Sequence, residues 1–253
     1  MDLKTADILR KLNNDFYRKQ AASFAATRKS PWPGWQRCLT VLNTQGDKGV
    51  RPPCQVFDLG CGNLRFETFL TSQFPAAGFS FYVVDNCDDL LPETPVVSYQ
   101  HLDVLEVLHQ GQDLSSQLTA PVCDLSVAFG LLHHIPLPEH RAEILTTLVN
   151  QTESGGRVIV SLWQFLRDPK RAEKARATHE RALQELGLPH LDPGDFLLGW
   201  KDLPGVYRYC HSFSEAEVDA LAASVAERAT LIDRFSADGR TGDLNTYLVL
   251  KSL

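Results

Sequence analysis

The sequence predicts an α/β fold whose centre is a doubly wound parallel sheet with a terminal antiparallel hairpin. Apolar segments alternate with amphipathic ones between residues 54 and 163, as strands and crossover helices do in such sheets. Residues 122–129 form a nearly continuous apolar run, which is typical of a strand covered on both faces. Near the end of the chain, 231–235 and 246–250 predict two strands, and the short stretch 238–243 between them indicates a hairpin.

The composition favours one globular domain with additions over two full domains. The 253 residues are 43% hydrophobic and 22% charged, as in ordinary globular proteins. The formal net charge of -6 argues against a strongly nonspecific nucleic-acid binder, although it allows one basic face. Charges run through the first 20 residues, and no apolar run approaches membrane-spanning length. We therefore expect a cytoplasmic protein with no membrane partner.

The six cysteines show no Cys-x-x-Cys spacing, and several lie in apolar segments. We interpret them as buried, reduced thiols and predict neither disulfides nor a metal site. They are Cys38, Cys54, Cys61, Cys87, Cys123 and Cys210.

The N-terminal part of the chain predicts a helical cap over residues 1–45, ahead of a domain that spans 46–253. Residues 3–26 have the amphipathic pattern of one or two helices. Pro33 suits the first turn of a further helix, which we expect to end at Leu42.

Trp32 and Trp35 flank Pro33 and have two equally good interpretations. One is core packing between the cap and the sheet. The other is a rigid aromatic wall beside Arg28, whose guanidinium would hold a carboxylate or a base.

The stretch from Cys54 to Asn63 reads CQVFDLGCGN and predicts a strand that breaks into a glycine loop before a helix. Gly60 and Gly62 permit positive φ and let a ligand lie against the main chain. The next strand, 79–84, stops at Asp85, where a carboxylate is placed to accept from both hydroxyls of a ribose. Together these features favour a nucleoside site over a merely structural turn.

The spacing differs from a dinucleotide fingerprint, because Arg65 stands where the third glycine is expected and Asp58 precedes the loop. A carboxylate there repels a pyrophosphate but suits a cationic methionine amino group. The pattern resembles the S-adenosylmethionine site of class I methyltransferases. This resemblance implies S-adenosylmethionine as cofactor, a Rossmann-like seven-stranded sheet, and cofactor-binding residues Asp58, Gly60, Cys61, Gly62, Asp85, Asn86, Asp103, Val104 and Phe129.

Residues 96–102 predict the third strand, which ends at Asp103. In the methyltransferase geometry, the Asp103 carboxylate would accept from the adenine amino group, and the Val104 amide would reach a ring nitrogen. Residues 86–89 predict the cap of a short helix between the second and third strands.

The fourth strand, 122–129, opens into a loop that carries His133 and His134. Ligands of open α/β sheets bind at the carboxyl ends of the strands, so we expect these residues near the methyl group to be transferred. The alternative is that one histidine packs and hydrogen-bonds locally while the other faces solvent. A zinc site would need further ligands at suitable spacing, and none is evident.

The rest of the chain predicts a helix at 137–150 and a turn with a fifth strand at 155–163. It then predicts a charged helix at 167–186, a loop at 194–200 and a short extended segment at 206–213. The charged helix lies in an expected helical insertion at about 164–196 and is either a solvated face or a phosphate-contacting patch. Ser214 and Glu217 predict a capping box for the next helix.

Several elements together resemble the tRNA wobble-uridine methyltransferases that esterify 5-carboxymethyluridine. They are Thr27-Arg28 before Pro31-Trp32-Pro33, the 58–63 loop, His133-His134, Arg208-Tyr209-Cys210-His211 and Asn245-Thr246-Tyr247. The resemblance spans almost the whole chain. It implies methyl transfer to a carboxylate on the wobble uridine of tRNA, and it allows a small activating protein subunit. The sequence departs from this family at Leu64-Arg65 and at 87–89.

Displacement at a sulfonium methyl needs alignment more than acid–base chemistry, and a carboxylate is already ionised at neutral pH. We therefore expect no essential general base. Acceptor-positioning residues are expected to be Arg28, His133, Arg208 and His211, with Trp32 and Tyr209 as stacking or wall residues. Two alternatives remain: a methyltransferase of small carboxylic or phenolic metabolites, and a noncatalytic binding subunit.

Overall fold

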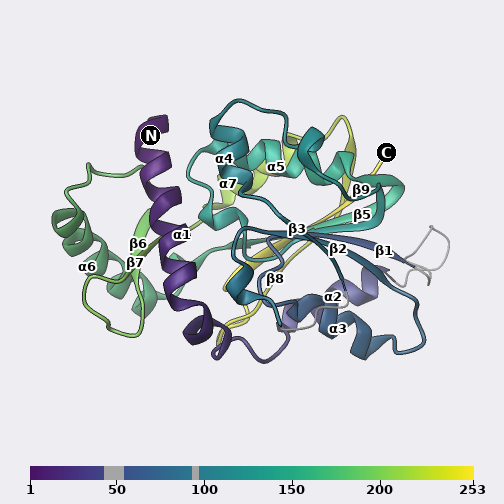
Figure 1. Ribbon diagram of the computed structural model, residues 1–253, viewed down its shortest axis with the longest axis horizontal. Coiled ribbons are helices and arrows are strands. Elements are labelled where there is room, and N and C mark those ends of the chain that lie inside the picture. The colour runs from purple at the N-terminus through teal and green to yellow at the C-terminus, as the bar shows by residue number, and fades with distance from the viewer. Residues whose placement is uncertain (43–53, 93–96) are drawn as a thin grey trace.

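The computed structural model describes residues 1–42, 54–92 and 97–253. Its centre is a seven-stranded sheet with the order β3-β2-β1-β4-β5-β9-β8 (Figure 1). The first five strands are parallel, and β9 pairs antiparallel with both β5 and β8. This arrangement confirms the doubly wound sheet and the terminal hairpin. The strands are β1 Gln55–Leu59, β2 Ser80–Asp85, β3 Ser98–His101, β4 Cys123–Ala128, β5 Thr152–Trp163, β8 Ala229–Ala237 and β9 Asn245–Ser252.

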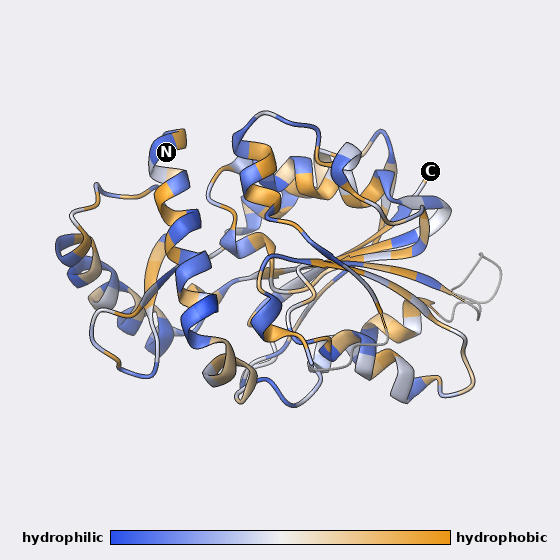
Figure 2. Cartoon of the chain, viewed as in Figure 1, coloured by the Kyte–Doolittle hydropathy of each residue, from blue (hydrophilic) through white to orange (hydrophobic). Residues whose placement is uncertain are grey.

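Helices cover both faces of the sheet because its central strands are apolar on both sides (Figure 2). On one face, α2 (Pro33–Leu42) and α3 (Arg65–Gln73) bury Trp35, Phe66 and Phe69. On the other face lie α4 (Val104–His109), α5 (Pro138–Asn150) and α7 (Glu215–Ala223). The described residues also form four short 3-10 helices, which are η1 Asp88–Leu90, η2 Ser115–Gln117, η3 Leu132–His134 and η4 Phe165–Arg167.

The strand order reverses between β1 and β4, and this switch point fixes where a ligand can bind. Asp58 of β1 pairs with Val83 on one side and Val127 on the other, so the carboxyl ends of three strands lie level. In open α/β sheets, the crevice outside such a switch point is the place for ligands. The sheet therefore directs its glycine loop and its acidic strand ends to one edge.

A smaller lobe stands beside the sheet and consists of the β6–β7 hairpin with the helices that pack on it, α1 (Leu3–Ala25) and α6 (Pro169–Leu186) (Figure 1). Its strands are β6 (Asp195–Gly199) and β7 (Tyr207–His211). The lobe has its own apolar core of Leu9, Ala182, Leu183, Leu197, Tyr207 and Tyr209. The helical insertion expected at 164–196 thus contains η4 and α6, and β6 begins where it ends.

The prediction of a loop at 194–200 is wrong, because this segment is strand β6. Gly194 and Gly199 give the segment the appearance of a loop, yet Leu197 between them is fully buried. Gly194 has a φ of 90°, and a Cβ there would lie 2.7 Å from Cε1 of His211. The glycine therefore permits close packing against β7 and does not break the strand.

Other differences concern lengths and positions outside the described residues. Helix α4 is absent from the sequence prediction, and β8 and β9 are each longer than predicted. The polar loop expected at 46–53, the boundary between 45 and 46, and residue 96 of the third strand lie outside the described residues. All six cysteines are free and buried, as predicted. Among the described helices, none has the length and apolar composition needed to cross a bilayer.

Candidate active site

A cavity of about 640 Å³ lies at the carboxyl ends of β1, β2 and β4. This volume is in the usual range for a small-molecule site. All nine residues predicted to bind the cofactor line the cavity. The facing wall is formed by α1, by Arg208 of β7, and by residues 26–32 between α1 and α2, here called the strap.

The glycine loop is held against the end of β2 by main-chain hydrogen bonds. Gly60 N and Cys61 N donate to the Val84 carbonyl at 2.8 and 3.2 Å, and Gly62 N donates to Oδ2 of Asp85 at 2.8 Å. The other Asp85 oxygen, Oδ1, accepts from Cys87 N at 3.0 Å. Gly60 and Gly62 have φ values of 83° and 53°. Asp85 is therefore fixed in one orientation at the cavity wall.

Leu64 and Arg65, where the sequence departs from the family pattern, join the glycine loop to α3. Leu64 has a φ of 56°, a left-handed conformation that is uncommon for a non-glycine residue, and its side chain is buried. Arg65 donates from Nη1 to the Ser30 carbonyl at 3.0 Å. Its guanidinium lies 5.4 Å from the centre of the Trp32 ring. Arg65 thus ties the start of α3 to the strap.

Both interpretations of the tryptophans find support in the structure. Trp35 is 2% exposed and packs with Phe66, Phe69 and Phe129 in the core. Trp32 stacks on Trp35 with ring centres 5.4 Å apart and lines the cavity. Trp35 supports the rigid ring of Trp32, which faces the ligand space.

Asp103 lines the cavity, but its carboxylate is already occupied. Oδ1 caps α4 by accepting from Leu105 N and Glu106 N, each at 3.1 Å. Oδ2 accepts from Arg10 at 2.6 Å and from Asn14 at 2.7 Å. An adenine amino group would have to compete with these two residues of α1. The sequence prediction missed Arg10, Asn14 and Tyr17, although their spacing of four and three places them on one face of a helix.

The opposite side of the cavity is cationic. Arg208 is 7% exposed, and its guanidinium lies 5.2 to 5.7 Å from the ring centres of Phe16, Phe24 and Trp200. Its Nε has no hydrogen-bond partner, and neither Arg208 nor Arg28 forms an ion pair with a carboxylate among the described residues. Burial lowers the pKa of Arg28, and the charge of Arg208 lowers it further. Two guanidinium groups thus repel each other beside the ligand space.

The two adjacent histidines have different environments. Nε2 of His134 accepts from the Tyr17 hydroxyl at 2.7 Å, and Nδ1 lies 3.0 Å from the Tyr209 carbonyl. Burial lowers the pKa of His134 to about 3, so this ring is neutral. His133 lines the cavity beside Trp163, its Nδ1 has no partner, and burial lowers its pKa as well. Of these two histidines, His133 is the one with a nitrogen available to a ligand.

Cys210 completes a group with these histidines that the spacing alone did not reveal. The potential ligand atoms of His133, His134 and Cys210 all lie within 4.8 Å of one another. A metal would have to displace the hydrogen bonds that already occupy both nitrogens of His134. We therefore assign no metal to this group.

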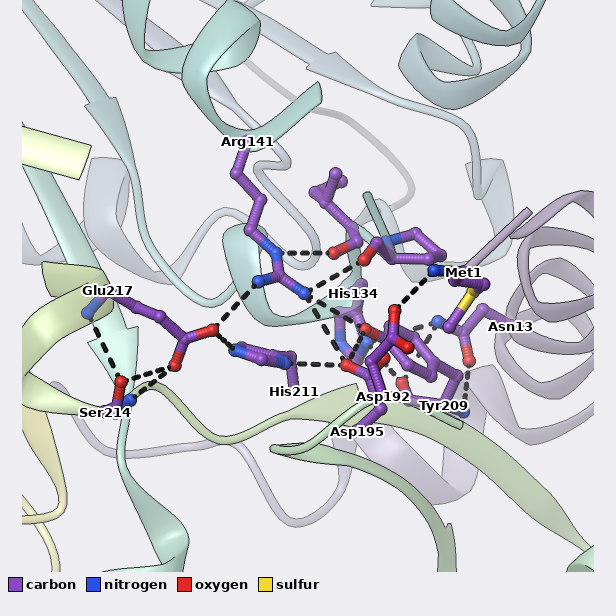
Figure 3. Close-up of polar contacts among 12 residues, drawn as sticks. Met1, Asn13, His134, Arg141, Asp192, Asp195, Tyr209, His211, Ser214 and Glu217 are labelled. Carbon is purple, nitrogen blue, oxygen red and sulfur yellow. Dashed lines mark hydrogen bonds and ion pairs between the residues drawn. The ribbon is translucent and has the colours of Figure 1, made fainter. Parts of the chain in front are cut away.

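The predictions that His211 positions the acceptor and that Tyr209 walls the pocket are wrong. Figure 3 shows His211 between Asp195 and Glu217, with ring nitrogens 2.6 and 2.9 Å from their oxygens. The Tyr209 hydroxyl donates to Asp195 at 2.6 Å, and neither side chain lines the cavity. Alternate residues of a strand point to opposite sides, so the two lie on the face away from Arg208.

Arg141 of α5 joins these groups to the loop that carries the histidines (Figure 3). It is 4% exposed and donates to the Ile135 carbonyl at 2.8 Å and to the Pro136 carbonyl at 3.1 Å. Its guanidinium also lies 3.6 Å from Asp195 and 3.7 Å from Glu217. Arg141 therefore couples the smaller lobe to the sheet.

Replacing Arg141 with Met is expected to lower the free energy of unfolding by about 3 kcal/mol, because two buried carbonyls and Asp195 lose their cationic partner. Urea unfolding monitored by circular dichroism measures this change. The control is Arg181→Met, since Arg181 is 64% exposed and its distance to Glu185 is 3.9 Å. A similar, small change in both variants would contradict a coupling role for Arg141.

Comparison with known proteins agrees with this geometry at the level of the fold. No family model matches the chain. In the crystal structure of an S-adenosylmethionine-dependent methyltransferase from Methanosarcina mazei, the similarity covers 89% of this chain and 99% of that one, with 15% identity and a TM-score of 0.58. The DhpI-SAM-HEP complex gives 15% identity and a TM-score of 0.58 over 96% and 97% of the two chains. The chain therefore has the class I S-adenosylmethionine-dependent methyltransferase fold.

The amino-acid sequence is also similar to that of two named methyltransferases. The chain is 24% identical over 158 residues to tRNA (carboxymethyluridine(34)-5-O)-methyltransferase ALKBH8 of Mus musculus, which is 61% of this chain and 20% of that protein. The protein of the same name from Macaca fascicularis is 24% identical over 151 residues, 58% of this chain and 19% of that protein. The matched region is thus about a fifth of the length of these curated relatives.

Proposed function

We propose that the chain transfers a methyl group from S-adenosylmethionine to a carboxylate on a modified wobble uridine of tRNA. The observation that carries the proposal is the division of charge in the cavity. Asp58 and Asp85 stand at the strand ends on one side, whereas Arg28 and Arg208 on the other have no carboxylate partner among the described residues. A cationic cofactor and an anionic acceptor match these two sides.

The residues present fit the cofactor. Asp85 is oriented by two main-chain donors and offers its remaining lone pairs to ribose hydroxyls. A Cβ on Gly62 would meet nothing within 4 Å, so this glycine leaves the main chain open to an adenosyl group. Asp58 supplies negative charge for the methionine ammonium. When bound, S-adenosylmethionine supplies an electrophilic methyl group on a sulfonium.

The chain's own contribution to the reaction is alignment and exclusion of water. Arg28 and Arg208 hold the acceptor carboxylate, whose oxygen attacks the methyl carbon while the carbon–sulfur bond breaks and its electron pair stays on sulfur. No proton moves in this step. His133, kept neutral by its surroundings, donates or accepts one hydrogen bond at the side of the acceptor, and Trp32 offers a face to a base.

Transfer RNA as the acceptor is supported by the distant likeness to ALKBH8 and by further cations at the cavity. Lys29 and Arg171 are exposed and line the cavity beside Arg28, in a place where phosphates of a bound nucleotide would lie. We include in the proposal a small activating subunit and a cytoplasmic location, the latter because six free thiols suit a reducing compartment.

The test begins with calorimetry of S-adenosylmethionine binding, followed by addition of bulk tRNA and mass spectrometry of its modified nucleosides. Cofactor binding, salt-sensitive tRNA affinity and a new methyl ester on 5-carboxymethyluridine would support the proposal. Cofactor binding without tRNA affinity would point to a small-metabolite acceptor instead. A chain that binds no cofactor would be a noncatalytic subunit.

A further inference from the structure

Two buried carboxyl groups meet at the floor of the cavity, Asp58 at the end of β1 and Glu67 in α3. Asp58 is 3% exposed and Glu67 is 4% exposed. Asp58 lines the cavity and Glu67 does not. Oδ1 of Asp58 and both oxygens of Glu67 have no hydrogen-bond partner among the described residues. Glu67 is not among the predicted site residues, although it occurs three residues from both Leu64 and Leu70 in the apolar stripe of its helix.

In the described part of the chain, no basic side chain forms an ion pair with Asp58 or Glu67. The other titratable groups that face this pair are Asp85 at the end of β2 and the thiol of Cys61 in the glycine loop, and both are acids. Arg65, the nearest basic residue in the sequence, directs its guanidinium to the Ser30 carbonyl and to the tryptophans of the strap and α2.

Two neighbouring buried carboxylates, three of whose four oxygens have no hydrogen-bond partner among the described residues, do not both ionise. Burial raises the pKa of both groups, and a charge on Glu67 raises the pKa of Asp58 further. A single proton held between the two side chains would supply the donor that the surrounding described residues lack.

We propose that Glu67 is a positioning residue for cofactor binding, which shares this proton with Asp58 until an ammonium group binds at Asp58 and the proton leaves for solvent. The inference rests on the proposed function, because the ammonium is that of the cofactor's amino-acid end. No covalent bond changes. The incoming cation takes over the charge compensation that the proton provides in the free protein.

The direction of the pH dependence follows from this exchange. The ammonium binds more tightly to the deprotonated pair, so affinity is weakest where the free pair holds its proton and increases as the pH rises through the raised pKa. If Glu67 were only a neutral packing residue, the proton would stay in place and affinity would not change across this range.

Calorimetry with S-adenosylhomocysteine tests the exchange, because this product keeps the ammonium but lacks the sulfonium charge. We expect affinity about tenfold weaker at about pH 6 than at about pH 8. At the lower pH, titrations in two buffers of different ionisation heat should show release of close to one proton per ligand. With 5′-methylthioadenosine, which has no amino-acid end, no proton release is expected.

The matched variant is Glu67→Gln, which keeps the shape of the side chain and removes one titrating group. It is expected to bind S-adenosylhomocysteine with less than twofold change between the two pH values and with heat that is independent of the buffer. Asp103→Asn, on the far side of the cofactor site, should weaken binding and keep the proton release. Thermal unfolding shows whether each variant is folded.

The outcomes separate this inference from the proposed function. If the unmodified protein binds S-adenosylhomocysteine with buffer-independent heat and constant affinity, Glu67 has no such role and the proposed function stands. If neither ligand binds, the proposed function itself is wrong. If Glu67→Gln does not fold, proton release by the unmodified protein with S-adenosylhomocysteine is compared with that with 5′-methylthioadenosine. Release with the first ligand alone supports the inference, and equal values for the two ligands contradict it.

Discussion

Replacing Arg208 with Met is expected to lower kcat/KM for the acceptor by about a hundredfold, or about 2.7 kcal/mol of transition-state stabilisation. The guanidinium is buried against three aromatic rings and has no carboxylate partner among the described residues. An anionic acceptor would therefore provide the negative charge that compensates it. Affinity for S-adenosylmethionine should change less than twofold, because Arg208 belongs to β7 of the smaller lobe whereas Asp58 and Asp85 end strands of the main sheet.

The same substitution is expected to leave the fold as stable as before, or more stable, because it removes a buried charge that lacks an anionic partner. Methyl-transfer assays and thermal unfolding of Arg208→Met measure the two effects. Arg208→Lys should restore part of the activity, since it keeps the charge but loses the planar fork. Equal loss of activity and of stability would instead assign Arg208 to the architecture of β7.

Replacing Asp85 with Ala is expected to weaken S-adenosylmethionine binding by about a hundredfold. The substitution removes the acceptor for Gly62 N, which holds the glycine loop, and the acceptor that we propose for ribose hydroxyls. Two charge-assisted hydrogen bonds of about 1.5 kcal/mol each account for a loss of this size.

Isothermal calorimetry measures this change directly. The control is Asp88→Ala, three residues further along the chain. The Asp88 side chain is 66% exposed and bonds to Tyr99 and His101, away from the ligand space. Its removal should change cofactor affinity less than twofold, and an equal effect of the two substitutions would refute the assignment of Asp85.

The sheet is predictable from the sequence because each of its central strands has a recognisable sequence feature within or next to it. The glycines after β1 and the aspartate that ends β2 are visible within a few residues, and the apolar run of β4 shows that it is covered on both faces. These features follow from backbone sterics and from burial, which act over short distances along the chain. The position of the cavity then follows from the strand order.

The smaller lobe is harder to predict, because its stability depends on contacts between distant segments. Asn13 of α1 accepts from Tyr209 N at 2.7 Å and donates to the Tyr209 carbonyl at 3.2 Å, across nearly two hundred residues of chain. No periodicity indicates such a pair. The motif Arg208-Tyr209-Cys210-His211 therefore contains one side chain that faces the cavity and two that hold β7 in place.

The environments of the acidic residues at the site are equally hard to predict from the sequence. Asp103 has the position that a cofactor ligand would have, yet only the structure shows that Arg10 already occupies its carboxylate. Glu67 is a charged residue type that is usually exposed, and it is nevertheless buried. In both cases the decisive fact is which element packs opposite, and that depends on the three-dimensional arrangement.

The six buried thiols provide a built-in set of probes for local opening. Burial raises the pKa of Cys210 to about 11 and that of Cys123 to about 12, so reaction with an alkylating reagent requires exposure of the sulfur. Cys210 belongs to the smaller lobe, and Cys123 lies in the sheet. Mass spectrometry of the order in which the thiols are alkylated would therefore rank the free energies of opening in different parts of the native protein.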